Sequence, residues 1–313
     1  MRKLIGVLLT GTALALAAAG AAYADYPERP VTFIVPWPPG DLEDQLTRVI
    51  AEEMQRETGV PAKVVNRPGG GGIEGATAVS QADADGYTIG SFVIDIPTMH
   101  VIKGNAEYTR DTFEPIGIFL TYPFALVAPA DAPYSNLSEL AEYAKSNPVR
   151  LGHFGYDLVP TMATFAAAQE HGFSFSTDAA FDSLDCSTLA TGDVDVMNTT
   201  MATVLGCLED VKVLAAYTDE PLSIKPDAPL LSEQVPGLDI TLWNGLFVPK
   251  GTPQEVKDKI AEIAEKAVQS DKAQDIAKAT GAGVYWTGAD EAAKRIDEDY
   301  AAAEALVESV QGK

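Results

Sequence analysis

The chain has 313 residues, with 45 Asp and Glu against 22 Lys and Arg, and its formal net charge is −23. Such an acidic surface repels nucleic acid and anionic lipid head groups, so we expect no nucleic-acid partner. The length is sufficient for two ordinary domains that each bury a core, and we interpret the acidity as an adaptation to solvation rather than a property of the site.

The first 24 residues have the pattern of a secretory signal peptide. Basic residues at positions 2 and 3 precede an apolar run over residues 4–19, and Ala22-Tyr23-Ala24 offers a cleavage site with small residues at both ends. We expect cleavage after Ala24 and a periplasmic mature protein. No later stretch approaches the roughly 18 apolar residues that a membrane-spanning helix needs.

Short apolar or β-branched runs then alternate with helical patterns. The first part predicts strands over residues 31–36, 62–66 and 87–94, a helix over 42–58 that ends at Gly59, and a helix near 73–82. The pattern recurs with strands over 124–129, 149–154, 176–181, 194–198 and 211–217 and helices over 135–147 and 161–171, before a mostly helical tail from 252. This order predicts an α/β fold with mainly parallel sheets.

The loop over residues 36–42 follows a predicted strand and opens a predicted helix, where backbone N–H groups point outward toward a ligand. Two consecutive prolines stiffen this loop, and Gly40 allows the backbone close to a bound carboxylate. Asp41 and Asp44 resemble a capping arrangement, which we favour over direct ligand contact for Asp41. Trp37 fits a pocket wall and a core position equally well.

A glycine-rich stretch over residues 70–75 matches the dinucleotide pattern G-x-G-x-x-G between a strand and a helix, with Asp95 about 20 residues further on. The Arg67-Pro68 pair widens the turn ahead of these glycines, and an exported protein meets little free NAD. We therefore disfavour a dinucleotide site and expect no cofactor.

Catalytic motifs such as H-E-x-x-H, C-x-x-C and G-x-S-x-G do not occur in the sequence. His153 could pair with Asp157 or Asp182 and a serine, but a single loop histidine is more often structural. We therefore expect no enzymatic activity.

The two cysteines, Cys186 and Cys207, would face an oxidising compartment after export. A disulfide between them would close a loop of about 20 residues and stabilise the fold by roughly 3 kcal/mol. Two free buried thiols or a metal pair are the alternatives, but none of the three histidines stands at ligand spacing from a cysteine. We favour the disulfide and expect no metal.

Four motifs in series carry a family resemblance: YPERPVTFIVPWPPGDLED over residues 26–44, VVNRPGGGG over 64–72, ADGYTIGS over 84–91 and LWNGLFVPKGTP over 242–253. Together they resemble the Bug or TctC family, the periplasmic solute receptors of tripartite tricarboxylate transporters. The resemblance implies a type II periplasmic binding fold with two α/β lobes, two crossover strands and a ligand cleft between the lobes. Lobe 1 would comprise residues 25–122 and 245–313, and lobe 2 residues 123–244.

The resemblance also implies a monomer that holds a small carboxylate and delivers it to membrane permease subunits. A receptor that docks on a sensor kinase of a two-component system would bind its ligand in the same way, and an exported enzyme is the weaker alternative. The ligand-binding positions carried over are Trp37, Pro39, Gly40, Asp41, Leu42, Asp44, Ser91, Phe92 and Asp95 in lobe 1, and Phe154, Gly155, Tyr156, Asp157, Asp182, Asn198 and Thr199 in lobe 2.

Several of these positions depart from the family pattern, since Asp41 replaces a glycine and Asp182 replaces a lysine. The expected cleft is bulkier and more acidic than usual. An uncompensated carboxylate about 4 Å from a bound anion costs roughly 4 kcal/mol. A tricarboxylate is therefore disfavoured, and a monocarboxylate, or a ligand with a cationic or hydroxyl group opposite Asp95, Asp157 or Asp182, fits better.

Overall fold

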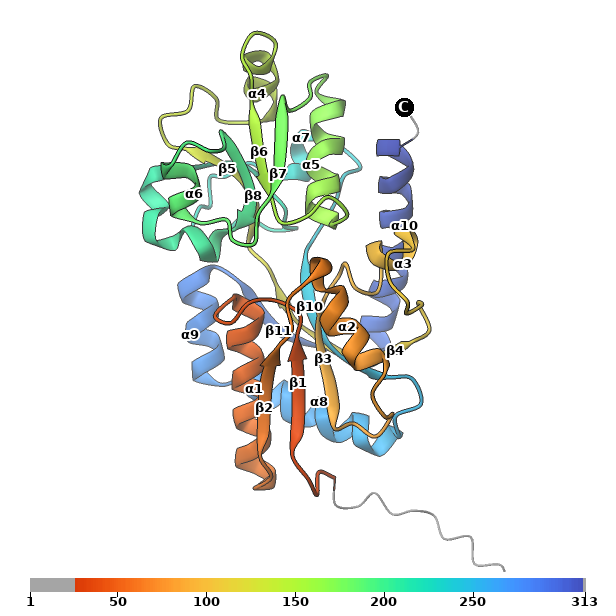
Figure 1. The fold of residues 1–313 in the computed structure, drawn as a ribbon. Helices are drawn as coiled ribbons and strands as arrows, with labels where there is room; N and C mark the ends of the chain where they lie inside the picture. The colour runs from red at the N-terminus through yellow and green to blue at the C-terminus, as the bar shows by residue number, and fades with distance from the viewer. Residues whose placement is uncertain (1–25, 312–313) are drawn as a thin grey trace, which may run out of the picture.

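The computed structural model describes residues 26–311, so the predicted signal peptide and its cleavage after Ala24 lie outside the described residues. The chain forms two lobes, each built on one sheet (Figure 1). The first sheet contains β1 (Val31–Val35), β2 (Ala62–Asn66), β3 (Thr88–Val93), β4 (Phe113–Thr121), β10 (Trp243–Pro249) and β11 (Gly283–Gly288), in the order β11-β4-β10-β3-β1-β2. The second contains β5 (Phe124–Pro129), β6 (Arg150–His153), β7 (Thr177–Ala180), β8 (Val196–Thr200) and β9 (Val211–Ala216), in the order β7-β6-β8-β5-β9.

Helices cover the faces of both sheets (Figure 1). The first lobe has α1 (Leu42–Thr58), the 3-10 turn η1 (Gly70–Gly72), α2 (Ile73–Ser80), α3 (Met99–Lys103), α8 (Gln254–Val268), α9 (Asp271–Thr280) and α10 (Ala289–Gln311). The second has α4 (Leu137–Ala144), α5 (Val159–Glu170), α6 (Cys186–Ala190), the 3-10 segment η2 (Met201–Asp210) and α7 (Leu231–Gln234). None of the described helices combines the length and apolarity needed to cross a membrane.

The two-lobed α/β fold is confirmed, but the prediction of mainly parallel sheets is wrong. β1 pairs in parallel with β2 and β3, whereas β10 runs antiparallel to both β3 and β4. In the second sheet β6 is parallel to β7 and β8, and β5 is antiparallel to β8 and β9. The reason is the crossover, because a chain that leaves one lobe and later returns must run in opposite directions on the two passages.

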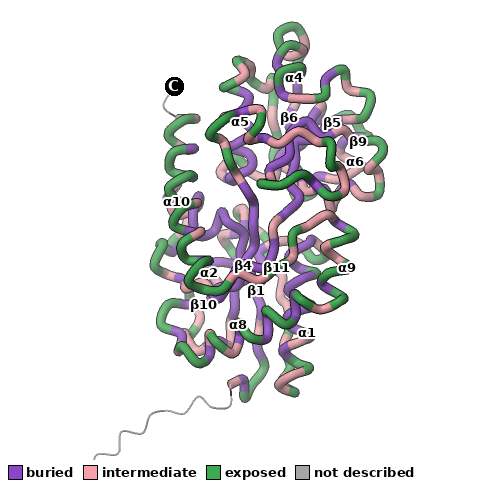
Figure 2. Tube along the Cα trace, turned by 180° about the vertical axis from the view of Figure 1, so that it is seen from behind, coloured by how far each residue is buried: buried purple, intermediate pink, exposed green. Residues whose placement is uncertain are grey.

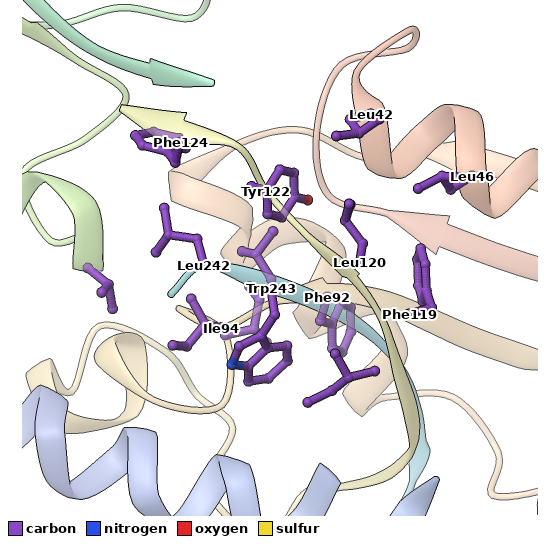
Figure 3. Packing of buried hydrophobic residues seen from close by; sticks show 14 of the residues in the cluster. Leu42, Leu46, Phe92, Ile94, Phe119, Leu120, Tyr122, Phe124, Leu242 and Trp243 are labelled. Carbon is purple, nitrogen blue, oxygen red and sulfur yellow. The ribbon is translucent and has the colours of Figure 1, made fainter. Parts of the chain in front are cut away.

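The chain leaves the first lobe at Tyr122-Pro123, between β4 and β5, and returns just before β10. Tyr122 and Trp243 are both buried on these passages (Figure 3). Purple buried segments run through both lobes and along the passages between them (Figure 2). Large apolar side chains therefore pack where the lobes join, and burial of each contributes about 1.5–3 kcal/mol relative to its exposed state.

The helix predicted over residues 42–58 is α1, and it ends as expected at Gly59. Gly59 has φ +71° and its N–H donates to the carbonyl of Gln55, which is the left-handed cap that glycine favours. Leu42, Leu46 and Ile50 form the buried face of α1 against the first sheet. The start of α1 is thereby fixed at the edge of the gap between the lobes.

Candidate ligand-binding site

A cavity of about 520 Å³ lies between the two lobes. Its walls come from the β1–α1 loop, the end of β3 and both crossover passages, and from the loops before α5 and α6 and the start of η2 in the second lobe. Predicted site residues that line it are Trp37, Pro39, Gly40, Asp41, Leu42, Asp95, Phe154 and Asp182. The structure therefore brings residues of both lobes to one cleft, whose size is typical of a small-molecule site.

Asp44 stabilises the start of α1 and does not line the cleft. Its Oδ2 accepts a hydrogen bond from the Gly40 N–H at 2.9 Å, and Arg48 donates to both of its oxygens at 2.9 Å. Burial by itself would raise the pKa of Asp44, but the hydrogen bonds from Arg48, Gly40 and Asn66 hold it below its usual range. This carboxylate is fully compensated by its neighbours.

Asp41 occupies the N-cap position of α1, but its side chain makes no capping hydrogen bond. The expectation that the Asp41 side chain caps the helix is therefore wrong, and of the two acids only Asp44 accepts a hydrogen bond from this loop, from the Gly40 N–H that precedes α1. Asp41 instead lines the cleft, where burial and the neighbouring Asp44 raise its pKa to about 6.

Glu43 also lines the cleft, and sequence reasoning missed it. It is only 4% exposed, and its Oε2 accepts a hydrogen bond from the Tyr122 hydroxyl at 3.0 Å. Burial, together with Asp41, raises the pKa of Glu43 to about 8, although the hydrogen bond from Tyr122 opposes that rise. The sequence did offer one indication of this buried acid, since Glu43 lies between Leu42 and Leu46, two apolar positions of the predicted helix.

Asp95 follows β3 and reaches across to the second lobe. Its Oδ1 accepts a hydrogen bond of 2.6 Å from the N–H of Val159, the first residue of α5. Burial raises the pKa of Asp95, while His100 and the Val159 N–H oppose that rise. The N-terminus of α5, where an anion is most readily held, is therefore already occupied by a carboxylate of the protein itself.

The loop before α5 divides between the cleft and the surface. Phe154 lines the cleft and packs edge-on against Phe124, with 6.2 Å between ring centroids. Tyr156 is 53% exposed and lies against the ring of His153. Asp157 pairs with Lys103 of the first lobe at 3.1 Å. Gly155, Tyr156 and Asp157 are thus outside the cleft lining, although they adjoin it in sequence.

Four more predicted positions lie in the protein interior and do not line the cleft: Ser91, Phe92, Asn198 and Thr199. The Ser91 hydroxyl lies 2.8 Å from that of Thr47, and the Phe92 ring stacks on Phe247. The Thr199 hydroxyl donates to the Leu184 carbonyl at 2.9 Å. Ser91, Phe92 and Thr199 thus pack behind the cleft, whereas the buried side-chain amide of Asn198 has no hydrogen-bond partner within the described residues.

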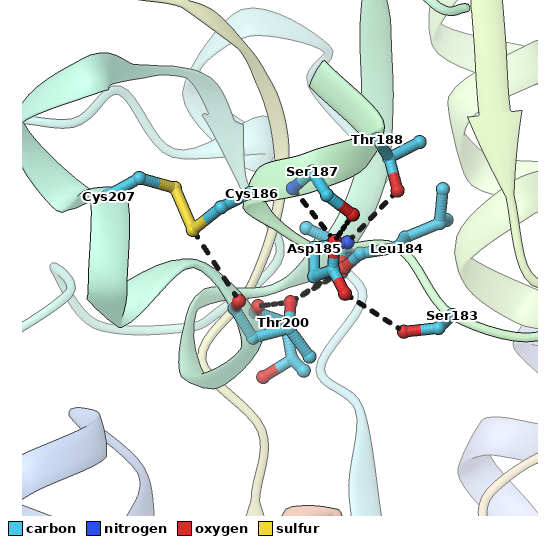
Figure 4. Close-up of a disulfide and its surroundings, with 10 residues drawn as sticks. Ser183, Leu184, Asp185, Cys186, Ser187, Thr188, Thr200 and Cys207 are labelled. Carbon is cyan, nitrogen blue, oxygen red and sulfur yellow. Dashed lines mark hydrogen bonds between the residues drawn. A yellow bond between two sulfur atoms is a disulfide. The ribbon is translucent and has the colours of Figure 1, made fainter. Parts of the chain in front are cut away.

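The predicted Cys186–Cys207 disulfide is confirmed, and it joins α6 to η2 across 5.9 Å between Cα atoms (Figure 4). Asp185 caps α6 by accepting from the Ser187 N–H at 2.8 Å. The Thr203 hydroxyl, in η2, donates to the Leu184 carbonyl at 2.8 Å. These links fix the loop that carries Asp182 into the cleft.

The glycine-rich loop packs against the protein's own chain. His100 donates from Nε2 to the Gly71 carbonyl at 2.8 Å. A Cβ atom at Gly72, whose φ is +99°, would lie 2.9 Å from the Ile96 side chain. The glycines of this loop are therefore required by close packing and by positive φ.

His153 is fully buried and its Nε2 lies 3.3 Å from a carboxylate oxygen of Asp178. Burial lowers the pKa of His153, against the opposing effect of Asp178. The pairing with Asp157 or Asp182 considered from the sequence is therefore replaced by a structural contact with Asp178.

Charge in the cleft has one sign. Within the described part of the chain, its lining contains four acidic side chains and no Lys, Arg or His. The four are Asp41, Glu43, Asp95 and Asp182. Around them stand the aromatic rings of Trp37, Tyr122, Phe124 and Phe154. The site thus combines four acidic groups with an apolar wall that includes four aromatic rings.

Two α/β lobes, two crossover passages and a cleft walled by both lobes define the class of two-lobed solute-binding proteins. The sequence model described as "Tripartite tricarboxylate transporter family receptor" matches residues 46–311, and the chain belongs to this family. A UPF0065 protein of Bordetella pertussis is 31% identical over 261 residues, covering 80% of each chain.

Solved structures agree with this assignment. The periplasmic binding protein BugD is 28% identical with a TM-score of 0.79, and the match covers 91% of this chain and 98% of BugD. MatC from Rhodopseudomonas palustris, a structure with bound malate, is 26% identical with a TM-score of 0.79, covering 90% of this chain and 100% of MatC. The family is one of solute receptors rather than enzymes.

Proposed function

We propose that the protein is a monomeric periplasmic receptor that binds a small organic carboxylate in the interlobe cleft and delivers it to the membrane permease subunits of a tripartite transporter. The observation that carries the proposal is the cavity of about 520 Å³ walled by both lobes. A ligand held there contacts both lobes at once, so binding and lobe closure are coupled.

Hydrogen-bond donors for a carboxylate are present in the cleft wall. Thr200 lines it and its hydroxyl donates to no other residue described, and the Trp37 Nε1–H has no hydrogen-bond partner within the described residues. MatC, a relative in the same structural family, is known with bound malate. These features support an organic acid as the ligand.

Export fits the rest of the chain. The signal-peptide pattern of residues 1–24 predicts secretion, and the Cys186–Cys207 disulfide is typical of proteins that fold in oxidising compartments. Delivery to permease subunits would follow in the periplasm.

Binding can be tested by thermal-shift screening of the mature protein with organic acids, amino acids and aromatic acids. A ligand at 100 times its dissociation constant should raise the free energy of unfolding by about 2.7 kcal/mol. Recovery of the same compound, unchanged, from the denatured complex separates a receptor from an enzyme. Failure of every organic acid to stabilise the protein would contradict the proposal.

Two aromatic residues of one loop provide a matched pair of variants. Phe154→Ala should weaken binding of any ligand found, because the ring lines the cleft. Tyr156→Ala should leave affinity unchanged, because that ring lies outside the cleft. Delivery is tested by uptake of labelled ligand into cells that express the receptor with or without the permease subunits.

A further inference from the structure

Three acidic side chains of the cleft, Asp41, Glu43 and Asp95, line the same cavity as Tyr122. Glu43 accepts a hydrogen bond from Tyr122 at 3.0 Å. Burial raises the pKa of Tyr122 well above its usual value, and Glu43, Asp41 and Asp95 raise it further. A small region of the cleft therefore gathers acidic groups from the start of α1 and the end of β3. The raised pKa values of Asp41 and Glu43 mean that these two groups become negatively charged as the pH rises through about 6 and about 8.

The acidic side chains at the start of α1 differ in whether they have a cationic partner. Asp44 stands three residues after Asp41 and is paired in bidentate fashion with Arg48. Asp41 and Glu43 have no salt-bridge partner among the described residues, and both show raised pKa values. Buried carboxylates without a counter-charge are costly, so a cation placed here is attracted by all of them.

Two backbone N–H groups at the cleft already have carboxylate partners. The Gly40 N–H, in the loop before α1, donates to Asp44. The Val159 N–H, at the start of α5, donates to Asp95. A ligand carboxylate that needs either of these two N–H groups would have to displace an internal carboxylate, so both positions disfavour a second negative group on the ligand.

Aromatic rings complete the environment. Trp37, Tyr122, Phe124 and Phe154 line the same cavity as the acidic groups. Aromatic faces attract ammonium groups, and the attraction is stronger where water is excluded. Acidic side chains among aromatic rings form an environment suited to an organic cation.

From this arrangement we infer that the solute carries a protonated amine, seated beside Asp41 and Glu43 and close to the Tyr122 ring, and no more than one carboxylate. The inference rests on the proposed receptor function and adds the charge of the ligand to it. Asp95 then acts as a specificity-determining residue, since it fills the position that a second ligand carboxylate would need.

Calorimetric titration with matched compounds tests this inference. Each of two sets contains three compounds with one carbon skeleton: an amine-free carboxylate, an amino carboxylate and an amine. The first set is pentanoate, 5-aminopentanoate and pentylamine. The second set is 4-methylbenzoate, 4-(aminomethyl)benzoate and 4-methylbenzylamine. In at least one set the amine-bearing forms should bind about tenfold or more tightly than the amine-free carboxylate, as expected for a charge-assisted contact.

Variants connect the preference to the named residues. Asp41→Asn and Glu43→Gln should each weaken binding of the amine-bearing form about tenfold. Each change should therefore reduce the ratio of the affinity for the amine-bearing form to the affinity for the amine-free form. Glu52→Gln provides the control, because this carboxylate belongs to the same helix but its side chain is 63% exposed and pairs with Lys272.

The pH dependence gives a second readout. An ammonium ligand prefers the ionised forms of Asp41 and Glu43, whose pKa values are about 6 and about 8. The other titratable or charged groups that face them are Asp44, which is paired with Arg48, and Tyr122 and Asp95. Its affinity should therefore rise between pH 5 and 9, a range in which an alkylamine of pKa about 10 stays protonated. An anionic ligand would show the opposite slope.

The outcomes separate this inference from the proposed function. Amine-free carboxylates that bind most tightly, with affinity that falls as the pH rises, would overturn the inference and leave the carboxylate receptor intact. Amines that bind without any carboxylate would support the inference and remove the carboxylate from the proposed function. No binding by any amine-bearing compound at millimolar concentration would also overturn the inference.

Discussion

Glu43→Gln should stabilise the ligand-free protein at alkaline pH while leaving it almost unchanged at acidic pH. The substitution removes a carboxyl group that is 4% exposed and keeps an oxygen that can accept the hydrogen bond from Tyr122. Shape and hydrogen bonding are preserved, so the comparison isolates the cost of the buried charge.

The size of the effect follows from the shift in pKa. The pKa of Glu43 rises from an ordinary 4.5 to about 8 on folding, first because of burial and then because of Asp41. The folded protein holds this proton more tightly than the unfolded chain, so the wild type loses stability as the pH rises between these values. The loss amounts to about 5 kcal/mol, at roughly 1.4 kcal/mol for each pH unit.

Urea unfolding followed by tryptophan fluorescence at several pH values between 5 and 9 measures the effect. The free energies of wild type and Glu43→Gln should differ by about 1 kcal/mol at pH 5 and by about 5 kcal/mol at pH 9. Glu52→Gln should follow the wild type throughout, because its side chain is exposed. A difference between wild type and Glu43→Gln that is constant over this range would refute the reasoning.

Four further outcomes are expected. Gly40→Val should cost about 1–3 kcal/mol of stability, because Gly40 has φ +96° and a β-branched residue is strained there even in open space; an unchanged urea midpoint would contradict this. Reduction of Cys186–Cys207 should lower stability by about 3 kcal/mol, and free thiols in the native protein, seen by non-reducing mass spectrometry, would show that the bond does not form. Ligand binding should compact the molecule by closing the lobes, so an unchanged radius of gyration in X-ray scattering at saturation would count against a hinge. Asp95→Ser should free the Val159 N–H and let dicarboxylates bind, and calorimetry that detects no gain would leave Asp95 without a role in specificity.

Much of the fold could be predicted from the sequence. The alternation of apolar runs and helical patterns located β1, α1, β2 and β3 and most elements of the second lobe close to their observed positions. The mixed character of the sheets was missed because β4, β10 and β11 pair across long separations in the chain, and no local periodicity reports strand direction. Such pairings are set by the route of the chain between the lobes.

The cleft was less accessible to prediction. The loop over residues 36–42 was expected from its position between a strand and a helix, and it does line the cavity. The roles of Asp41 and Asp44 depended on which carboxylate reached the Gly40 N–H, and side-chain direction is not visible in a sequence. Glu43 was missed because the apolar stripe of α1 gave no reason to place an acid against Tyr122.

The C-terminal helix α10 belongs to the first lobe but extends alongside α5 of the second and packs against it (Figure 1). Any opening of the lobes has to separate these two helices, so their contact contributes to the balance between open and closed populations. The apparent dissociation constant of a ligand varies inversely with the fraction of molecules in the competent form. Residues on α10 that no solute touches therefore set part of the affinity, and substitutions there can retune uptake while the chemistry of the cleft stays the same.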